Sequence, residues 1–340
     1  MASGLRTASR QRGRYRFGVA ASSGFLIGLC VARAQNLAMS RKTPFVLVDV
    51  FTSRPFGGNQ LAVFTDGAAL SAAEMQELAH EMNFSESTFV MPLESSGARR
   101  VRIFTPMHEL PMAGHPTVGT TWVLATRGEI ALDSPSVDAT LQLGIGPVTV
   151  TVESTDKRPE FVWMAHREAE FGAQRRDRGR IAKALGITPA DIRDDLPIQI
   201  VSTGFPFMFV PVRTLDALAK CSPNAPALAS LFKSGEQRLA VYMFVPNESG
   251  EFSARSRMFA PFTGVAEDPA TGSAAAPFGA YAATYGLINP APTATFTIHQ
   301  GVEMGRPSEI RVEVIRKNNG AFALRIGGRC AIVGEGSIFL

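Results

Sequence analysis

The sequence has few cysteines, few charges and no long hydrophobic run, and each shortage excludes a class of protein. Three cysteines in 340 residues are too few for a disulfide-stabilised scaffold. Charged residues make up 19% of the chain and hydrophobic ones 45%, which argues against a disordered or coiled-coil protein. No stretch approaches the roughly 20 apolar residues of a membrane-spanning helix, so we expect no membrane partner. A soluble globular chain, long enough for two hydrophobic cores, remains.

The net charge of +4 is distributed unevenly along the chain. Residues 1–48 carry eight basic side chains and no acidic one, which leaves 26 basic and 30 acidic residues from Asp49 onward. The globular part therefore has no excess of positive charge with which to hold a nucleic-acid backbone. We expect no nucleic-acid partner.

Residues 1–43 form a leader or an N-terminal extension with three possible interpretations. The basic start followed by an uncharged run resembles a secretory signal, and the abundance of Arg and Ser without acids resembles an organelle transit peptide. The third interpretation is that the protein starts at Met39. Outside the leader only Cys221 and Cys330 occur, which gives no support to an oxidising compartment. We expect a cytoplasmic location, or an organellar or exported one if residues 1–38 are a true targeting leader.

The chain repeats one series of motifs. Arg102-Ile103-Phe104-Thr105-Pro106 matches Arg257-Met258-Phe259-Ala260-Pro261 at an offset of 155 residues, and Gly114 matches Gly272 at an offset of 158. A repeated order of strand, turn, strand, Pro and Gly-containing loop predicts two similar α/β halves. We place them at residues 44–166 and 167–340.

Each repeat is expected to combine strands with one buried helix, which makes the fold class α+β. Breaker residues 55–59 join strands 46–51 and 61–64, and strands 88–91 and 101–104 form a hairpin around residues 94–97. A capping box at Ser71 and Glu74 opens a helix. Apolar strands between residues 141 and 163 close the first half, and a polar stretch at 167–180 leads into a helix-like segment at 181–185.

The two buried helices carry almost no charge. Pro116 and Gly128 predict a helix over residues 117–127, and Gly272-Ser273 opens a second helix that Gly286 ends. Because helix N-termini expose unpaired N–H groups, each can bind a carboxylate. If a pseudo-twofold relates the halves, both N-termini converge on one cleft between them.

Three ionisable residues surround these turns. Glu86 precedes an apolar strand, where desolvation would raise its pKa toward neutrality. His115 and Asp268 lie in the first and second glycine turns. The structural alternatives are an exposed Glu at a strand entry, a His that caps a helix and an Asp that forms a turn.

Other kinds of site have little support in the sequence. His108 and His115 are seven residues apart, which matches no standard metal-ligand spacing. Neither Cys221 nor Cys330 lies in a glycine turn, and no nucleophile elbow or dinucleotide fingerprint occurs. We expect no metal, thiol, serine-hydrolase or dinucleotide chemistry.

Five motifs resemble the PhzF-like phenazine biosynthesis family. They are Val48-Asp49-Val50-Phe51, Phe56-Gly57-Gly58-Asn59, Ser85-Glu86-Ser87-Thr88-Phe89, Glu109-Leu110-Pro111-Met112-Ala113-Gly114-His115-Pro116-Thr117 and Glu267-Asp268-Pro269-Ala270-Thr271-Gly272-Ser273-Ala274. The resemblance covers about residue 44 to the C-terminus. It implies a diaminopimelate-epimerase-like fold, in which two halves, each a curved mixed sheet around a central helix, enclose the site in their cleft.

The resemblance also implies the chemistry. The phenazine enzyme isomerises a dihydro-hydroxyanthranilate by moving a proton between ring carbons without a cofactor, and family members are expected to form homodimers. Glu86 matches its acid/base residue, and His115 and Asp268 match its other catalytic positions. Gly114, Gly272, Ser273 and Asn59 are the implied substrate-binding residues. Gln60 and Met112 stand where the family often has Pro and Phe, which puts the substrate in doubt.

The expected function is therefore a cofactor-independent isomerase of a small, cyclic carboxylic acid, with Glu86 moving a carbon-bound proton. Two alternatives stay open. One is a racemase or epimerase of an amino or hydroxy acid, in which Glu86 and either Asp268 or His115 act as opposed bases. The other is a binding protein that keeps the fold without turnover.

Overall fold

A computed structural model describes residues 41–95, 97–232, 238–247 and 251–340. The leader predicted at residues 1–43 thus lies outside the described residues except at its last three positions. Residues Thr43–Ile338 form one compact unit, which contains every predicted site residue, and Met1–Lys42 with Phe339–Leu340 are a separate unit. In the described part of the chain we find no helix that is both long and apolar enough to cross a membrane.

The described elements are mostly strands. The strands are β1 (Lys42–Val50), β2 (Asn59–Phe64), β3 (Glu86–Leu93), β4 (Arg99–Phe104), β5 (Glu109–Leu110), β6 (Ser136–Leu143), β7 (Gly146–Thr155), β8 (Arg158–His166), β9 (Glu170–Arg175), β10 (Ile198–Ser202), β11 (Pro206–Pro211), β12 (Ala240–Asn247), β13 (Ser253–Ala260), β14 (Val265–Asp268), β15 (Thr293–Gln300), β16 (Ser308–Arg316), β17 (Phe322–Gly328) and β18 (Cys330–Phe339). The helices are α2 (Ala72–Met82), α3 (Gly114–Thr126), α4 (Arg178–Leu185), α5 (Leu215–Lys220), α6 (Ala225–Ala229) and α7 (Gly272–Thr284), with single 3₁₀ turns at Pro189–Asp191 and Pro261–Thr263.

Strand pairing confirms the internal duplication. In the first series β2 runs parallel to β3, β3 antiparallel to β4 and β4 parallel to β6, and antiparallel pairs then join β6, β7 and β8. The second series has the same order of parallel and antiparallel pairs through β11, β12, β13, β15, β16 and β17. The two repeats therefore share one topology.

The strands that follow each series link the repeats. β9 pairs with β10, and β18 pairs with β1, so that the end of each series adds to the start of the other. β8 and β17 also pair with each other, antiparallel. The division that we predicted at residues 166 and 167 falls between β8 and β9, and it stays a prediction.

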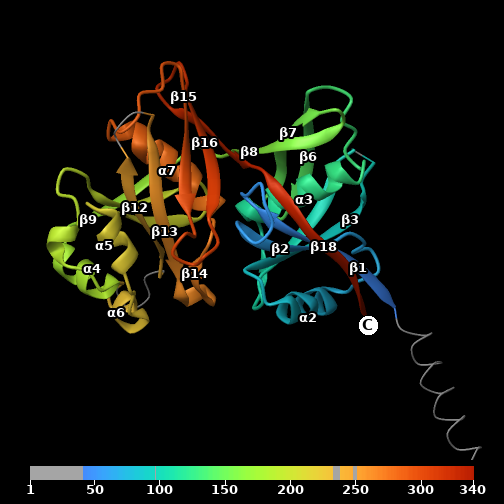
Figure 1. Cartoon of the computed structure of the whole chain (residues 1–340), viewed down its shortest axis with the longest axis horizontal. Coiled ribbons are helices and arrows are strands. Elements are labelled where there is room, and N and C mark those ends of the chain that lie inside the picture. Colours follow the sequence, from blue (N-terminus) through green and yellow to red (C-terminus); the bar gives the residue numbers. More distant parts are fainter. Residues whose placement is uncertain (1–40, 96, 233–237, 248–250) are drawn as a thin grey trace, which may run out of the picture. The chain divides into compact units, whose positions relative to one another are not determined.

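Each repeat surrounds one apolar helix. α3 packs against β2, β3, β7 and β8, and α7 packs against β10, β16 and β17 (Figure 1). Both helices are buried along nearly their whole length, as their lack of a polar face predicted. The architecture is thus α+β, with a central helix inside a curved mixed sheet in each half.

The local helix signals locate the starts of α2 and α7 and the ends of α3 and α7, but not the start of α3. The capping box of Ser71 and Glu74 is present at the start of α2. Gly128 and Gly286 follow α3 and α7 with positive φ angles of 74° each, as predicted. The predicted start of the first buried helix at residue 117 is wrong, because α3 begins at Gly114. Pro116 is therefore its third residue.

The polar stretch at residues 167–180 is another difference from the prediction. It contains β9, whose residues are nearly all exposed and which pairs antiparallel with β10. Strand formation here comes from pairing with a neighbour and not from burial of one face. The predicted hairpin of β3 and β4 is confirmed, although residue 96 of its turn lies outside the described residues.

Candidate functional site

The N-termini of the two central helices meet. A Cβ added to Gly114 would lie 2.8 Å from the backbone N of Ser273 and 3.0 Å from the Cα of Gly272. A Cβ added to Gly272 would lie 3.4 Å from the Cα of Gly114. Only residues without a side chain allow so close an approach of two backbones. The convergence of both helix starts, which the duplication predicted, is confirmed.

Neither helix start is capped by a side chain among the residues that the structure describes. Ala113, in an extended conformation with φ −151° and ψ 150°, occupies the N-cap position of α3 and offers no acceptor. Thr271 occupies that of α7, but its side chain makes no capping hydrogen bond; it donates instead to Asp268. Two sets of helical N–H groups and two positive dipole ends therefore lie side by side.

Both helix starts line a cavity of about 330 Å³. Its lining includes Glu86, Gly114, His115, Asp268, Gly272 and Ser273. The rest of the wall is largely apolar, with Leu110, Pro111, Met112, Ile145, Phe205, Phe207 and Met258 among its residues. A few polar groups in a mostly apolar hollow are typical of a small-molecule site.

Glu86, the first residue of β3, lines the cavity, and its role in proton transfer stays a prediction. Its side chain is 16% exposed, and its Oε2 lies 3.5 Å from Nε2 of His115. Burial, together with the nearby charge of Asp268, raises the pKa of Glu86 to about 8. A carboxyl group with such a pKa can both release and accept a proton near neutral pH.

Asp268, at the end of β14, is a buried carboxylate that accepts three side-chain hydrogen bonds. Its Oδ1 accepts hydrogen bonds from Asn59 (2.8 Å) and Ser85 (3.2 Å), and its Oδ2 accepts one from Thr271 (2.5 Å). Burial raises the pKa of Asp268 to about 6, and these three donors oppose that rise. Because donors stabilise the ionised form, Asp268 keeps its negative charge while Glu86 holds the proton.

His115 lies in the first turn of α3 as a neutral imidazole. Burial lowers its pKa to about 3, although a backbone hydrogen bond with Gln60 acts in the opposite direction. Its contact with Glu86 is therefore one of an acid with an uncharged ring, and not an ion pair. Within the described part of the chain, Nε2 of His115 is buried without a hydrogen-bond partner. That atom is available to a bound molecule.

Asn59 lies beneath the site. Its Nδ2 is 3.2 Å from Nδ1 of His115, and it donates to Asp268 Oδ1 and to the backbone O of Ala270 at 3.0 Å. We predicted Asn59 as a substrate-binding residue, but it is only 1% exposed and is absent from the described residues that line the cavity. Its contacts orient the imidazole and the carboxylate.

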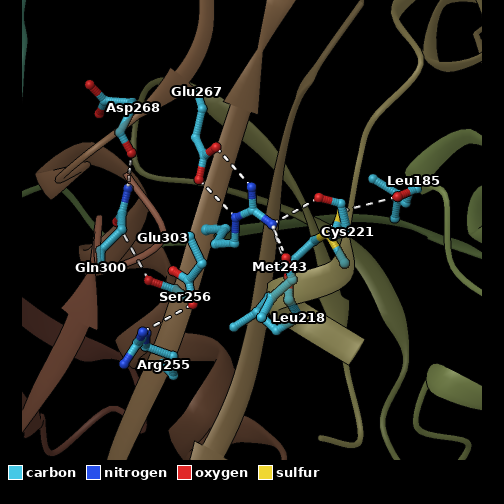
Figure 2. A network of polar contacts seen from close by, with 12 residues as sticks. Leu185, Leu218, Cys221, Met243, Arg255, Ser256, Glu267, Asp268, Gln300 and Glu303 are labelled. Atoms are coloured by element: carbon cyan, nitrogen blue, oxygen red, sulfur yellow. Dashed lines mark hydrogen bonds and ion pairs between the residues drawn. The ribbon is translucent and has the colours of Figure 1, made fainter. Parts of the chain in front are cut away.

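Sequence reasoning missed Gln300, which is completely buried. Its Nε2 donates to the backbone O of Asp268 (2.7 Å) and to Thr271 Oγ1 (3.0 Å), and its Oε1 accepts from the Thr271 N–H (3.2 Å). Figure 2 shows Gln300 beside Asp268. One amide thus fixes both ends of the segment between β14 and α7. Its position at the end of β15 gave no local signal for this role.

Each repeat also contains the same arginine–glutamate pair. Arg102 binds Glu109 through two hydrogen bonds of 2.7 and 2.6 Å, and Arg257 binds Glu267 through two of 2.8 and 2.9 Å. Nη1 of Arg257 also donates to the carbonyls of Leu218 (2.9 Å) and Cys221 (2.8 Å). Glu267 and the residues around this guanidinium are shown in Figure 2. Both arginines belong to the repeated motif.

Among the described residues, no three His, Cys, Asp or Glu side chains are grouped so that they could hold a metal ion. Both cysteines outside the leader are buried, and burial raises the pKa of the Cys221 thiol to about 12. The described cysteines therefore have little thiolate character.

Comparisons with known sequences agree with these motifs. The family model for phenazine biosynthesis-like proteins, PhzC-PhzF, matches residues 48–336. An uncharacterised isomerase from Mesorhizobium japonicum is 36% identical over 304 residues, covering 87% of this chain and 98% of the relative. The trans-2,3-dihydro-3-hydroxyanthranilate isomerase of Pseudomonas fluorescens is 35% identical over 300 residues, covering 87% and 99%.

Solved structures confirm the fold. A PhzF-family phenazine biosynthesis protein from Bacillus anthracis superposes with a TM-score of 0.80 at 26% identity, covering 88% of this chain and all of that one (100%). A predicted epimerase from Pseudomonas aeruginosa gives 0.71 at 32% identity, covering 87% and 99%. A hydroxyproline epimerase from Agrobacterium vitis gives 0.62 at 15% identity, covering 88% and 92%, which shows the shared epimerase-like fold alone.

Proposed function

Because this chain belongs to the phenazine biosynthesis-like protein family, we propose that it is a cofactor-independent isomerase of a small, cyclic carboxylic acid. The relatives at 35 and 34% identity from Pseudomonas fluorescens and Pseudomonas chlororaphis are trans-2,3-dihydro-3-hydroxyanthranilate isomerases, which supports the isomerase class. The observation that carries the proposal is the position of Glu86 at the wall of a cavity whose floor is formed by two uncapped helix N-termini.

The substrate carboxylate binds at the paired helix starts. N–H groups at Gly114, Gly272 and Ser273 are the donors in this proposal, and the two helix dipoles favour the negative charge. A ring attached to that carboxylate then lies against the apolar wall. This arrangement brings ring carbons within reach of Glu86.

The reaction moves one proton. The ionised carboxylate of Glu86 removes a proton from a ring carbon, and the electron pair of that C–H bond passes into the neighbouring double bond. The resulting enolate-like anion is stabilised by the helix N–H groups and by a hydrogen bond with the free Nε2 of His115. Glu86 then returns the proton further along the same conjugated system, so that no cofactor is required.

Asp268 and Asn59 support this chemistry from outside the reacting atoms. The charge of Asp268 helps raise the pKa of Glu86, so that the proton is held neither too tightly nor too loosely. Asn59 keeps His115 and Asp268 in fixed positions. Replacement of either residue should change the rate more than the fold.

The test is proton transfer by the Glu86→Gln variant on trans-2,3-dihydro-3-hydroxyanthranilate, followed by NMR in D₂O. The variant keeps the shape of the side chain and removes the base, so turnover should fall by roughly 10²- to 10⁴-fold. A variant that turns over at the wild-type rate would refute the role of Glu86. Rapid exchange of all transferred hydrogen with solvent would instead favour two opposed bases, as in a racemase or epimerase. A wild-type protein that binds the compound without any exchange would favour the silent binding protein.

We also propose a cytoplasmic homodimer, which is an expectation from the family resemblance and the lack of a disulfide pattern. Light scattering of the purified chain measures the mass of the assembly. N-terminal sequencing of the native protein tests the location. A chain that begins at Met1 or Met39 fits a cytoplasmic location, whereas a chain cleaved within residues 1–38 fits a targeting leader.

A further inference from the structure

The cavity is larger than a single-ring substrate needs. An apolar cavity of about 150 Å³ is enough to hold benzene, whereas this one measures about 330 Å³. A ring with its carboxylate at the helix starts therefore fills roughly half of the space. The remaining part must be occupied by water or by a further portion of the ligand.

Arg167 is the one arginine or lysine among the described residues that line the cavity. It follows β8 and is exposed, whereas His115 and Asp268 at the helix starts are buried. This difference in exposure places Arg167 at the outer end of the hollow. The lining thus changes from buried acid–base groups to a solvent-facing cation.

The charge of Arg167 is not neutralised by a described residue. Its neighbour Glu168 is engaged by Lys317, at 2.7 Å between Nζ and Oε1. The carboxyl groups of the cavity itself, Glu86 and Asp268, belong to its buried part. A free guanidinium at the mouth of a largely apolar pocket attracts anions and binds carboxylates with two parallel hydrogen bonds.

The cavity wall beside Arg167 consists of packed residues and is not an open surface. Thr203 and Gly204, between β10 and β11, line it, and Thr203 Oγ1 contacts Nδ1 of the half-buried His166 at 3.3 Å. Cε of Met112 lies 4.0 Å from the position that a Cβ on Gly204 would take. Met112, one of the two departures from the family pattern, lies beside Gly204 in this wall.

We infer that Arg167 forms an outer subsite that binds a second anionic group of the substrate, carried on an apolar arm that passes Met112. The inference rests on the proposed function, because it takes the ring carboxylate to be held at Gly114 and Gly272. It names the substrate class as a cyclic carboxylic acid with a second acidic group several bonds from the ring. In this inference Arg167 acts on substrate specificity and not on the proton transfer.

The experiment compares two probes by isothermal titration calorimetry. One is 3-(2-carboxyethyl)benzoate, which carries both acidic groups, and the other is 3-propylbenzoate, which has an arm of the same length without the second charge. The wild-type protein should bind the dianion roughly 10-fold more tightly than the monoanion. Arg167→Gln should reduce this ratio to about 1 with little change in the affinity for 3-propylbenzoate.

Two further variants separate the contact from net charge. Arg311→Gln removes an exposed arginine of β16 that is not among the described cavity-lining residues, and it should leave the ratio unchanged. Arg167→Lys keeps a cation without the planar fork, and it should retain part of the preference.

The outcomes distinguish this inference from the proposed function. Equal affinities in the wild type, an unchanged ratio in Arg167→Gln, or no binding of either probe would overturn the outer subsite. The proposed function is judged separately by proton transfer in Glu86→Gln. If Glu86→Gln loses proton transfer while Arg167→Gln leaves the probe ratio unchanged, the isomerase proposal stands and only the role of Arg167 is refuted.

Discussion

The backbone of Gly114 lies against that of Gly272, with 3.4 Å between the Cα of the first and the position of a Cβ on the second. The first residues of α3 and α7 are thus part of one contact and, in the proposed function, of one anion site. Because the same two backbones do both, any group that separates them changes the fold and the binding of substrate together.

Gly114→Ala should weaken both the fold and the binding of substrate. The added Cβ would lie 2.8 Å from the backbone N of Ser273, and backbone atoms cannot turn aside as a side chain can. We expect a loss of roughly 1–3 kcal/mol in the free energy of unfolding and about a 10-fold rise in KM. Gly334→Ala is the matched control, since its Cβ would meet nothing within 4 Å. Equal effects of the two substitutions would contradict the close approach.

The pH dependence of catalysis should follow Glu86. Burial and the charge of Asp268 raise its pKa to about 8, and the base form starts the reaction. We expect kcat/KM to rise with pH and to level off above about 8, because this ratio reports the free enzyme. His115, with its pKa near 3, should add no inflection between pH 5 and 8. A profile that falls over this range would show that Glu86 acts first as an acid.

The stability of the fold should also depend on Glu86. Its pKa is raised from 4.5 to about 8, so in this interval the folded state binds the proton and the unfolded state does not. The free energy of unfolding must then fall as pH rises from 4.5 to 8, by at most about 1.4 kcal/mol per pH unit from this group.

The interval between pH 6.5 and 8 isolates that effect. The lowered pKa values of His115 and His166, about 3 and 4, act below 6.5, and the raised pKa of Asp268 acts below about 6. Denaturant unfolding at pH 6.5 and 8 should show a loss of stability in the wild type and a smaller one in Glu86→Gln. The same slope in both proteins would mean that Glu86 is ionised in the fold.

The two arginine–glutamate pairs should differ in their contribution to stability. The side chains of Arg257 and Glu267 are 9 and 18% exposed, whereas those of Arg102 and Glu109 are 21 and 42% exposed. Removal of one partner from a buried pair costs about 3–5 kcal/mol, and an exposed pair contributes about 0–1. Arg257→Met should therefore be much more destabilising than Arg102→Met in denaturant unfolding. A similar loss of stability in both variants would show that the deeper burial of Arg257 and Glu267 does not increase their contribution to stability.

Much of the fold follows from local sequence. Ser71 and Glu74 are three residues apart and satisfy each other's helix-start groups, so the start of α2 could be predicted from local sequence. The glycines at 128 and 286 adopt positive φ angles that end a helix irrespective of its neighbours. The repeated motif predicted two similar halves, because the same local pattern was present twice.

The remainder depends on contacts that no local pattern records. The start of α3 was placed three residues late because Ala113 carries no capping side chain, so that Pro116 was the first visible signal. β9 has no alternation of buried and exposed residues and exists through its pairing with β10. For the site, Glu86, His115 and Asp268 could be predicted from their motifs, but Gln300 and Arg167 reach it only through long-range packing.

Ala113 has one further consequence. A helix whose N-cap residue is alanine lacks a stabilising contribution of about 1 kcal/mol that Ser, Thr, Asp or Asn would provide at that position. In the proposed function, a carboxylate bound at Gly114 would accept the hydrogen bonds that no capping side chain accepts. Folding and ligand recognition are in this way thermodynamically linked, and occupancy should raise the melting temperature of the chain.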